Sequence, residues 1–374
     1  MTEGTCLSRP AQAGRPAPPP FGRDGGANHT VHYKDSIRSM TSPFTLSIDW
    51  LAFTIPTASA RETMDILEGD WTKVKGVFRG YRFVWITTST GRGVGKLGTG
   101  VDRNPGEVHV DLSGGLVAQW SPEKVRAVLQ WVLQKNGHLT RLDCALDDRA
   151  SSVSLTTIKD AIGAGQCVTR AKCWQKTWSG LIHEGISTGE TVYLGSRQSQ
   201  TLLRIYDKRL QMQSQERLDW QDYGIRWELE LKQDRAQLCG QMLSYLDETL
   251  WLEFIVGVLR SHVDFRDTQR DEVEEYRYRA PLLDWWATLT EGFRKSRLVV
   301  EKKPQTLADV KSWLHHSVGP LLAVVLERPD GYESLQRIAK AGKKRWKTKH
   351  HRLLEQCGHN GEPAAVWPTE LNGS

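Results

Sequence analysis

Several kinds of targeting signal are missing from this chain of 374 residues. No apolar run approaches the roughly 20 residues that a membrane-spanning helix needs. The N-terminus has no compact apolar segment after its first charges, and residues 10–20 are rich in proline, so we expect no secretory signal. These absences favour a protein that stays in the cytosol and has no membrane partner.

Cysteine is scarce and irregularly spaced. The six cysteines form no CxxC pair and no repeating pattern, which argues against a zinc site and against a disulfide framework. Hydrophobic residues make up 39% and charged residues 25% of the chain, which is the balance of a globular protein. The length is enough for two domains.

Positive charge is concentrated near the C-terminus. The chain carries 50 Lys and Arg against 44 Asp and Glu, a net charge of +6. No acid occurs between residues 337 and 352, where the basic residues are Arg337, Lys340, Lys343, Lys344, Arg345, Lys347, Lys349 and Arg352. Eight cations without an acid are more than solubility requires, so this segment predicts a basic arm that contacts phosphate groups. The alternative is a solvated helix or tail.

The apolar pattern predicts strands first and helices later. Residues 1–42 are rich in Pro, Gly and Ala without periodicity, so we expect a disordered tail, with either Met1 or Met40 as the true start. Helices are predicted at residues 121–137 and 155–162, and the chain after Gln233 reads as mostly helical. Alternating residues predict strands from residue 44 and at 81–86, 108–112, 140–147, 192–194, 202–206 and 225–232.

This order of elements predicts an α+β fold in which a mainly antiparallel sheet carries the active site and a helical C-terminal region follows. We divide the chain into a disordered tail (1–42), a catalytic domain (43–233), a helical C-terminal region (234–330) and the basic arm (331–374).

Three of the predicted strands place polar side chains at alternate positions. In residues 141–147, Arg141, Asp143 and Asp147 share one face, because successive side chains of a strand point to opposite sides. If the three strands are neighbours, one sheet face carries four carboxylates, a tyrosine and several cations. The other two strands contribute Arg204, Tyr206 and Lys208, and Arg226, Glu228, Glu230 and Lys232.

Such a face has a definite chemistry. Carboxylate oxygens suit a hard cation such as Mg²⁺ or Mn²⁺, which would offset the charge of a phosphodiester. Cations beside Tyr206 would favour its phenolate as a nucleophile. The alternative is an ordinary solvated face with cross-strand pairs such as Glu228 with Arg204. Carboxylates two residues apart need a cation nearby, which favours the first interpretation.

Four segments, in order along the chain, resemble the motifs of the rolling-circle replication initiation factor family. This family includes Rep proteins of small Gram-positive plasmids, relaxases of some integrative elements and replication proteins of certain filamentous phages. The similarity covers residues 44–326 and omits both tails. The four segments are RLD (141–143), YLGSR (193–197), LRIYDK (203–208) and RWELE (226–230).

The resemblance implies a metal-dependent nick by a tyrosine that stays joined to the 5′ phosphate and leaves a free 3′ hydroxyl. Tyr206 matches the motif tyrosine and is flanked by Arg204 and Lys208. Tyr193 is the other candidate, although a strand aromatic packed on the core is the favoured role for it. The acids that would hold Mg²⁺ or Mn²⁺ are Asp143, Glu228 and Glu230, with Asp147 on the face of Asp143.

The same resemblance implies a partner DNA, a replication origin in single-stranded or supercoiled form. A host helicase and polymerase would act after the nick, and plasmid relatives suggest a homodimer. We therefore expect an enzyme that nicks and rejoins one strand to start rolling-circle replication of a phage or plasmid. Two alternatives stay open: a DNA-binding replication or regulatory protein that has lost catalysis, and a nuclease in which water attacks.

Two other motifs are absent or incomplete. Another class of rolling-circle nickases binds metal through two histidines flanking one hydrophobic residue, and this triplet is absent. Residues 91–97 superficially resemble a phosphate loop, but Thr90 and Leu97 stand where glycine and Ser or Thr are needed. We expect a flexible hairpin loop at this segment.

Overall fold

The protein is described by a computed structural model that covers residues 42–358, except 89–92, 103, 184, 216–217, 219, 269–273 and 300–305. The chain divides into two compact units, Met1–Val300 and Glu301–Ser374. The predicted boundaries at residues 233 and 330 differ from this division, because the helix after residue 233 packs on the large sheet. The predicted tail, apart from Ser42, lies outside the described residues.

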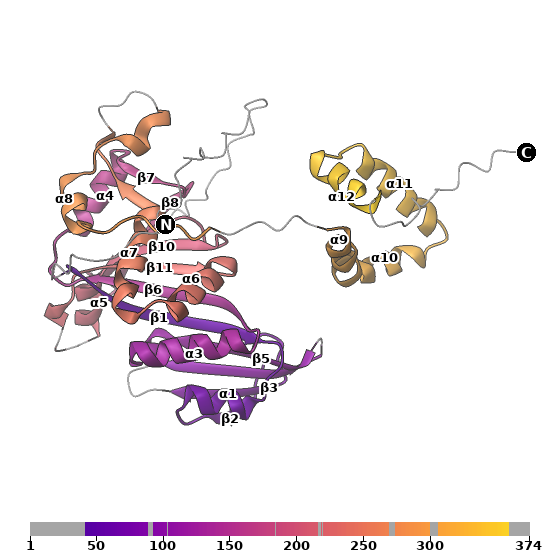
Figure 1. Ribbon diagram of the computed structural model, residues 1–374, viewed down its shortest axis with the longest axis horizontal. Coiled ribbons are helices and arrows are strands. Elements are labelled where there is room, and N and C mark those ends of the chain that lie inside the picture. Colours follow the sequence, from indigo (N-terminus) through magenta and orange to yellow (C-terminus); the bar gives the residue numbers. More distant parts are fainter. Residues whose placement is uncertain are drawn as a thin grey trace, which may run out of the picture. The chain divides into compact units, whose positions relative to one another are not determined.

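A ten-stranded sheet forms the body of the first unit, and each of its strand pairs is antiparallel (Figure 1). A two-stranded sheet pairs β7 (Cys167–Thr169) with β12 (Val263–Phe265). The predicted α+β fold is confirmed. In spatial order the large sheet contains β2 (Thr72–Val74), β3 (Phe83–Thr88), β4 (Val94–Val101), β5 (Asn104–Ser113), β1 (Phe44–Ile55), β6 (His138–Asp148), β11 (Ile225–Lys232), β10 (Thr201–Asp207), β9 (Ile186–Leu194) and β8 (Trp174–Leu181).

Helices pack against this sheet (Figure 1). Helix α6 (Asp234–Tyr245) packs on β6 and on α3 (Pro122–Gln134), and α7 (Trp251–His262) packs on β1. Short 3₁₀ turns, η1 (Trp220–Asp222), η2 (Glu248–Leu250) and η4 (Glu274–Arg279), connect these elements. The helices of the first unit are α1 (Ala60–Leu67), α2 (Gly114–Val117), α3 (Pro122–Gln134), α4 (Leu155–Gly163), α5 (Lys208–Ser214), α6 (Asp234–Tyr245), α7 (Trp251–His262) and α8 (Asp284–Leu289).

Helix α3 contains the capping residue, the initial proline and the apolar spacing from which a helix is predicted at residues 121–137. The Ser121 side chain accepts a hydrogen bond from the backbone N–H of Lys124, and Pro122 begins the helix, where its missing N–H costs nothing. Its apolar residues recur every three or four positions and are buried: Val125, Val128, Leu129 and Val132. The predicted helix is confirmed, although it ends at Gln134.

The alternation of β11 separates core from site. Trp227, Leu229 and Leu231 are fully buried in the core on one face of the sheet. Glu228 and Glu230 therefore point to the opposite face, although they too are buried. The polar side chains of the central strands therefore lie on the sheet face opposite the hydrophobic core.

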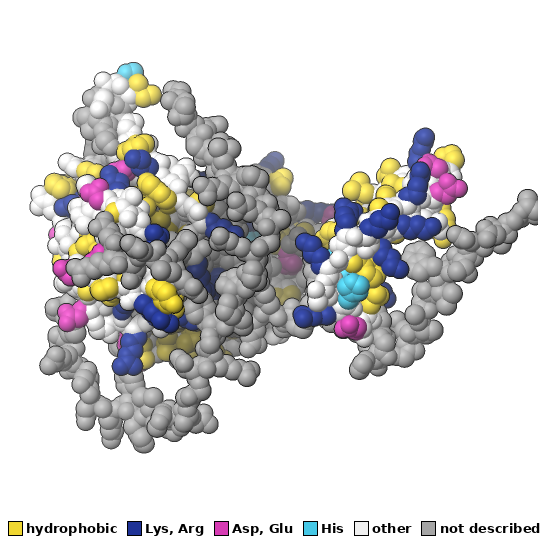
Figure 2. All heavy atoms as spheres, turned by 90° about the horizontal axis from the view of Figure 1, so that it is seen from above, with side chains coloured by type: hydrophobic (Ala, Val, Ile, Leu, Met, Phe, Trp, Pro, Cys, Tyr) yellow, Lys and Arg dark blue, Asp and Glu magenta, His cyan; other side chains and the backbone are white. Residues whose placement is uncertain are grey.

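The second unit contains helices only, within the residues that the structure describes. They are α9 (Leu307–Trp313), the π-helix η5 (Leu314–Val318), α10 (Gly319–Leu326), α11 (Gly331–Lys343) and α12 (Thr348–Gly358). The described part of the predicted basic arm contains α11 and α12, and the arm's residues 359–374 lie outside the described residues. Figure 2 shows Lys and Arg side chains spread over the surface of this unit, at the right of the view.

Two smaller expectations concern single segments. Val94 to Leu97 form the start of β4, which pairs with β3 as a hairpin, so this half of the predicted flexible loop is strand. Residues 91 and 92 lie outside the described residues. Among the described helices, none combines the length and the apolar character that a membrane span needs.

Candidate active site

The three polar strands predicted from the sequence are neighbours in the sheet, in the order β6, β11, β10. Glu230 of β11 stands opposite Asp143 of β6, and Glu228 stands opposite Arg204 of β10. Opposite residues of an antiparallel pair point to the same face. The register therefore gathers side chains from positions far apart in the chain on one sheet face.

Arg204 is the centre of this group. Its Nη2 atom lies 2.8 Å from Oδ2 of Asp143, 2.8 Å from Oε1 of Glu228 and 3.0 Å from Oε2 of Glu230. The three carboxylate side chains are only 1%, 4% and 10% exposed. Three of the four predicted metal ligands thus converge on one guanidinium group, and this arrangement is buried rather than an ordinary solvated face.

Two further cations complete the charge balance of these carboxylates. Arg141 Nη2 lies 2.6 Å from Asp143 and 3.1 Å from Glu230, and its guanidinium lies 4.2 Å from the centre of the Trp50 ring. Lys232 Nζ lies 2.5 Å from Oε1 of Glu230. Arginine and lysine therefore supply the positive charge that the closely spaced acids require.

Asp147 belongs to a separate pair. Arg226 donates to both of its carboxylate oxygens at 2.6 Å and to Asp49 Oδ1 at 3.1 Å. Asp49 is a site residue that the sequence analysis missed, because β1 has a bulge between Ile48 and Trp50 that breaks the simple alternation. Its only signal was a carboxylate in the polar half of that alternation.

Tyr206 lies beside both groups. Its hydroxyl donates to Oε2 of Glu228 at 3.2 Å, and Lys208 Nζ lies 5.8 Å from the centre of its ring. Burial, and then the charge of Glu228, raise the pKa of Tyr206 well above its ordinary value. The charges of Arg226 and Arg204 act in the opposite direction and favour the phenolate, but they are outweighed by burial.

Two groups near Tyr206 have pKa values close to neutral. Burial raises the pKa of Glu228 to about 7, although the charge of Arg204 opposes the rise. Burial and the charge of Arg226 lower the pKa of Lys208 to about 8. A carboxylate that accepts a hydrogen bond from a phenol, and that titrates near neutrality, can take the phenol proton.

A hollow of about 230 Å³ opens over these side chains. Tyr193 of β9 stands opposite Arg204 and is half-buried at the wall of this hollow. Packing of Tyr193 on the core, its favoured role from the sequence, is therefore wrong. The hollow is lined by Ser179, Gly189, Glu190, Thr191, Tyr193, Arg204, Tyr206, Asp207, Gln211 and Glu228.

The carboxylates offer oxygen donors that suit Mg²⁺ or Mn²⁺. Within the residues that the structure describes, however, no three His, Cys, Asp or Glu side chains are grouped as metal ligands. The point at which Asp143, Glu228 and Glu230 converge holds the guanidinium of Arg204. The acids as arranged here do not form a cation site.

Comparisons with known proteins add to this geometry. A family model described as "Replication initiation factor" matches residues 137–337, more than half of the chain, and includes β6, β10 and β11. A curated protein of Bacillus subtilis (strain 168), "Putative DNA relaxase NicK", is 26% identical over 198 residues. The match covers 52% of this chain and spans about half, 54%, of that protein.

A solved structure of a rolling circle replication initiator protein from Geobacillus stearothermophilus has a similar fold. Its TM-score is 0.55 at 22% sequence identity, and the match covers 68% of this chain and 98% of that chain. At this identity the likeness shows the fold.

Proposed function

Because the chain belongs to the replication initiation factor family, we propose that it nicks and rejoins one strand of a specific DNA to start rolling-circle replication of a phage or plasmid. The observation that carries the proposal is Tyr206, which lines a surface hollow and whose hydroxyl donates a hydrogen bond to Glu228. A tyrosine at such a place is a suitable nucleophile for a phosphodiester.

The proposed reaction exchanges one ester for another. The Tyr206 oxygen attacks phosphorus and forms a bond to it, and the bond from phosphorus to the 3′ oxygen breaks. The leaving oxygen takes a proton and becomes the free 3′ hydroxyl, while the 5′ phosphate stays on the tyrosine. Attack of the 3′ hydroxyl on this phosphotyrosine reverses the step and rejoins the strand.

Glu228 is the proposed acceptor of the phenol proton. Burial disfavours a free Tyr206 phenolate, so the proton must leave as the new bond forms. Oε2 of Glu228 is already in place at 3.2 Å. Arg204 lines the same hollow and Lys208 lies against the tyrosine ring, so both cations can face the entering phosphate.

The proposal extends to a divalent cation, Mg²⁺ or Mn²⁺. Asp143, Glu228 and Glu230 could hold such an ion only if the Arg204 guanidinium left the point where the three carboxylates converge and moved toward the entering phosphate. The ion would then supply further positive charge to the scissile phosphate. Asp147 would stay with Arg226, which engages both of its oxygens.

Removing divalent ions with EDTA is expected to lower the nicking rate by more than about tenfold, because the two positive charges of the ion at the phosphate are lost. DNA affinity should stay nearly constant, and added Mn²⁺ or Mg²⁺ should restore the rate. The measurement is nicking of supercoiled origin DNA on an agarose gel, with affinity from fluorescence anisotropy. Undiminished nicking in EDTA would mean that Arg204 alone supplies the charge.

One experiment separates the proposed function from its alternatives. Supercoiled origin DNA is incubated with protein and Mg²⁺, and the products are resolved under denaturing conditions. A nicked strand covalently attached to protein supports the proposal. Nicks without attachment would indicate water as the attacking group, and intact DNA would indicate a binding protein without catalysis. A host helicase, a polymerase and a homodimer belong to the proposal as further partners.

The basic arm is proposed to contact DNA phosphates. Deleting everything after Pro329 would remove α11, against which α10 packs, so neutralising exposed lysines is the cleaner change. Replacing Lys340, Lys343 and Lys344 by glutamine should weaken binding of duplex origin DNA. The slope of log affinity against log salt should fall by about 0.9 for each phosphate that is no longer neutralised. An unchanged slope, equal to that of the exposed control Lys75→Gln, would return the arm to a solvated surface.

A further inference from the structure

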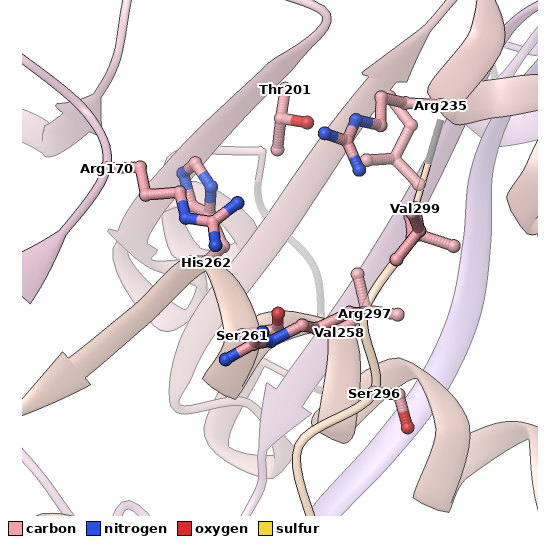
Figure 3. A pocket seen from close by; sticks show the side chains of 11 residues that line it. Arg170, Thr201, Arg235, Val258, Ser261, His262, Ser296, Arg297 and Val299 are labelled. Carbon is pink, nitrogen blue, oxygen red and sulfur yellow. The ribbon is translucent and has the colours of Figure 1, made fainter. Parts of the chain in front are cut away.

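A second hollow lies on the opposite face of the sheet from Tyr206. Leu231 and Thr201 form a cross-strand pair of β11 and β10 at its wall, and they alternate with the residues of the active site. Its volume is about 330 Å³. Figure 3 shows the guanidinium groups of Arg170 and Arg235 turned toward the space between them. The lining residues are Arg170, Thr201, Leu231, Arg235, Val258, Ser261, His262, Ser296, Arg297, Leu298 and Val299.

The lining of this hollow is basic. A smaller neighbouring hollow of about 220 Å³ shares Arg170, Ser261, His262 and Arg297 with it, and its other lining residues include Arg260 and Lys295. Among the described residues, no Asp or Glu lines either one. Of the acids close by, Asp264 is paired with three cations, Arg260, Arg266 and Lys295.

The cations inside the hollow act on one another. Burial lowers the pKa of Arg235, and the positive charge of Arg170 lowers it further against the pull of Asp234. Burial lowers the pKa of His262 to about 4, and the charges of Arg235 and Arg170 act in the same direction. The His262 Nε2 atom is buried without a hydrogen-bond partner in the described part of the chain. A bound anion would relieve this repulsion between positive charges.

An exposed aromatic ring stands beside the cations. Tyr278 lines the smaller hollow and is 47% exposed. The Arg279 guanidinium lies 5.3 Å from the centre of its ring. A tyrosine face next to a groove of cations is the arrangement on which proteins stack the bases of a single strand. A phosphate or sulfate ion has no flat ring that could stack on Tyr278, so the tyrosine favours a nucleotide as the ligand.

We propose that the two hollows bind a single strand of DNA, with a backbone phosphate between Arg170 and Arg235 and a base against Tyr278. Hollows of about 330 and 220 Å³ have room for a phosphate with its sugar but not for the paired strands of a duplex. The inference rests on the proposed function in that the ligand is DNA, and it places a second contact for the strand on the face away from the tyrosine.

The test uses the full chain with Arg170 and Arg235 both replaced by glutamine. Neither residue belongs to the active site, so a short labelled oligonucleotide should still form the Tyr206 adduct. Affinity for a longer single strand is measured by fluorescence anisotropy over a range of salt. We expect roughly a tenfold loss of affinity, and a fall in the salt slope of about 0.7 for each phosphate that is no longer bound. Arg61→Gln, an exposed arginine on α1, is the matched control.

The outcomes are distinct. Affinity and slope equal to those of the control would overturn the proposed strand site while leaving the nicking function intact. Absence of the adduct in the wild type, with the affinity loss preserved in the variant, would overturn the function but keep the strand site. If pyrophosphate or ATP, rather than the oligonucleotide, loses affinity in the variant, the hollow binds a free nucleotide and the proposal fails. Should the double variant unfold, Arg235→Gln alone is tested by the same readouts.

Discussion

Replacing Tyr206 by phenylalanine is expected to abolish both nicking and the covalent adduct while DNA binding is retained. The change removes one oxygen and almost no packing volume, and the only hydrogen bond described for that oxygen goes to Glu228. The protein should therefore fold normally, which circular dichroism would check. The adduct is measured on a denaturing gel with labelled origin DNA, and affinity by fluorescence anisotropy.

Tyr193→Phe is the matched control, because both tyrosines line the same hollow. It should keep the adduct and the nicking rate within about twofold, since no proton acceptor is hydrogen-bonded to Tyr193 among the contacts described. The reverse result would make Tyr193 the nucleophile. If both variants still nick without an adduct, water attacks and the tyrosine mechanism is wrong.

Replacing Glu228 by glutamine is expected to lower the nicking rate by more than about tenfold, because the acceptor of the phenol proton is removed. DNA affinity should stay constant or rise slightly, since a negative charge near the phosphate is removed. The fold should survive, because Arg204 keeps Asp143 and Glu230 as partners. Single-turnover nicking rates and anisotropy measure the two effects.

The pH profile gives this prediction a second readout. The pKa of Glu228 is raised to about 7, so the carboxylate is protonated below that pH and cannot accept the proton. The wild-type rate should rise as pH increases through about 7, and this rise should vanish in Glu228→Gln. Glu190→Gln serves as control, because Glu190 lines the same hollow but is paired with Lys159. Equal loss of binding and nicking would instead assign Glu228 a role in the fold.

Periodicity was enough to predict the strands that carry the site. The alternation in residues 140–147, 202–206 and 225–232 corresponds to β6, β10 and β11, and the assumption that they are neighbours is confirmed by the sheet order. Alternation also separated the two faces correctly, because a strand has a period of two whatever its surroundings. The resemblance to a family added the order of motifs.

Details of the site depended on three-dimensional geometry that alternation does not encode. Nothing in the sequence says that Arg204 reaches three carboxylates at once, because this depends on the registers of β6, β10 and β11 together. The bulge that adds Asp49 was equally hidden. The backbone of residue 114 packs directly against that of Asp49, and only glycine allows this, since a Cβ at Gly114 would lie 2.5 Å from the backbone oxygen of Asp49. The sequence also did not show that α6 packs on the sheet, and for this reason the first compact unit extends past residue 233 to Val300.

Arg226 joins parts of the chain that are synthesised at very different times. It is buried with Asp147, 79 residues earlier, and reaches Asp49, 177 residues earlier. Contacts of such separation form late in folding, because a long loop must close before they can. Until β11 emerges from the ribosome, the acids of β1 and β6 have no buried partner from that strand. A chain that ends before β11 therefore lacks the arginine that holds Asp147 and Asp49 together, and cannot assemble this part of the site.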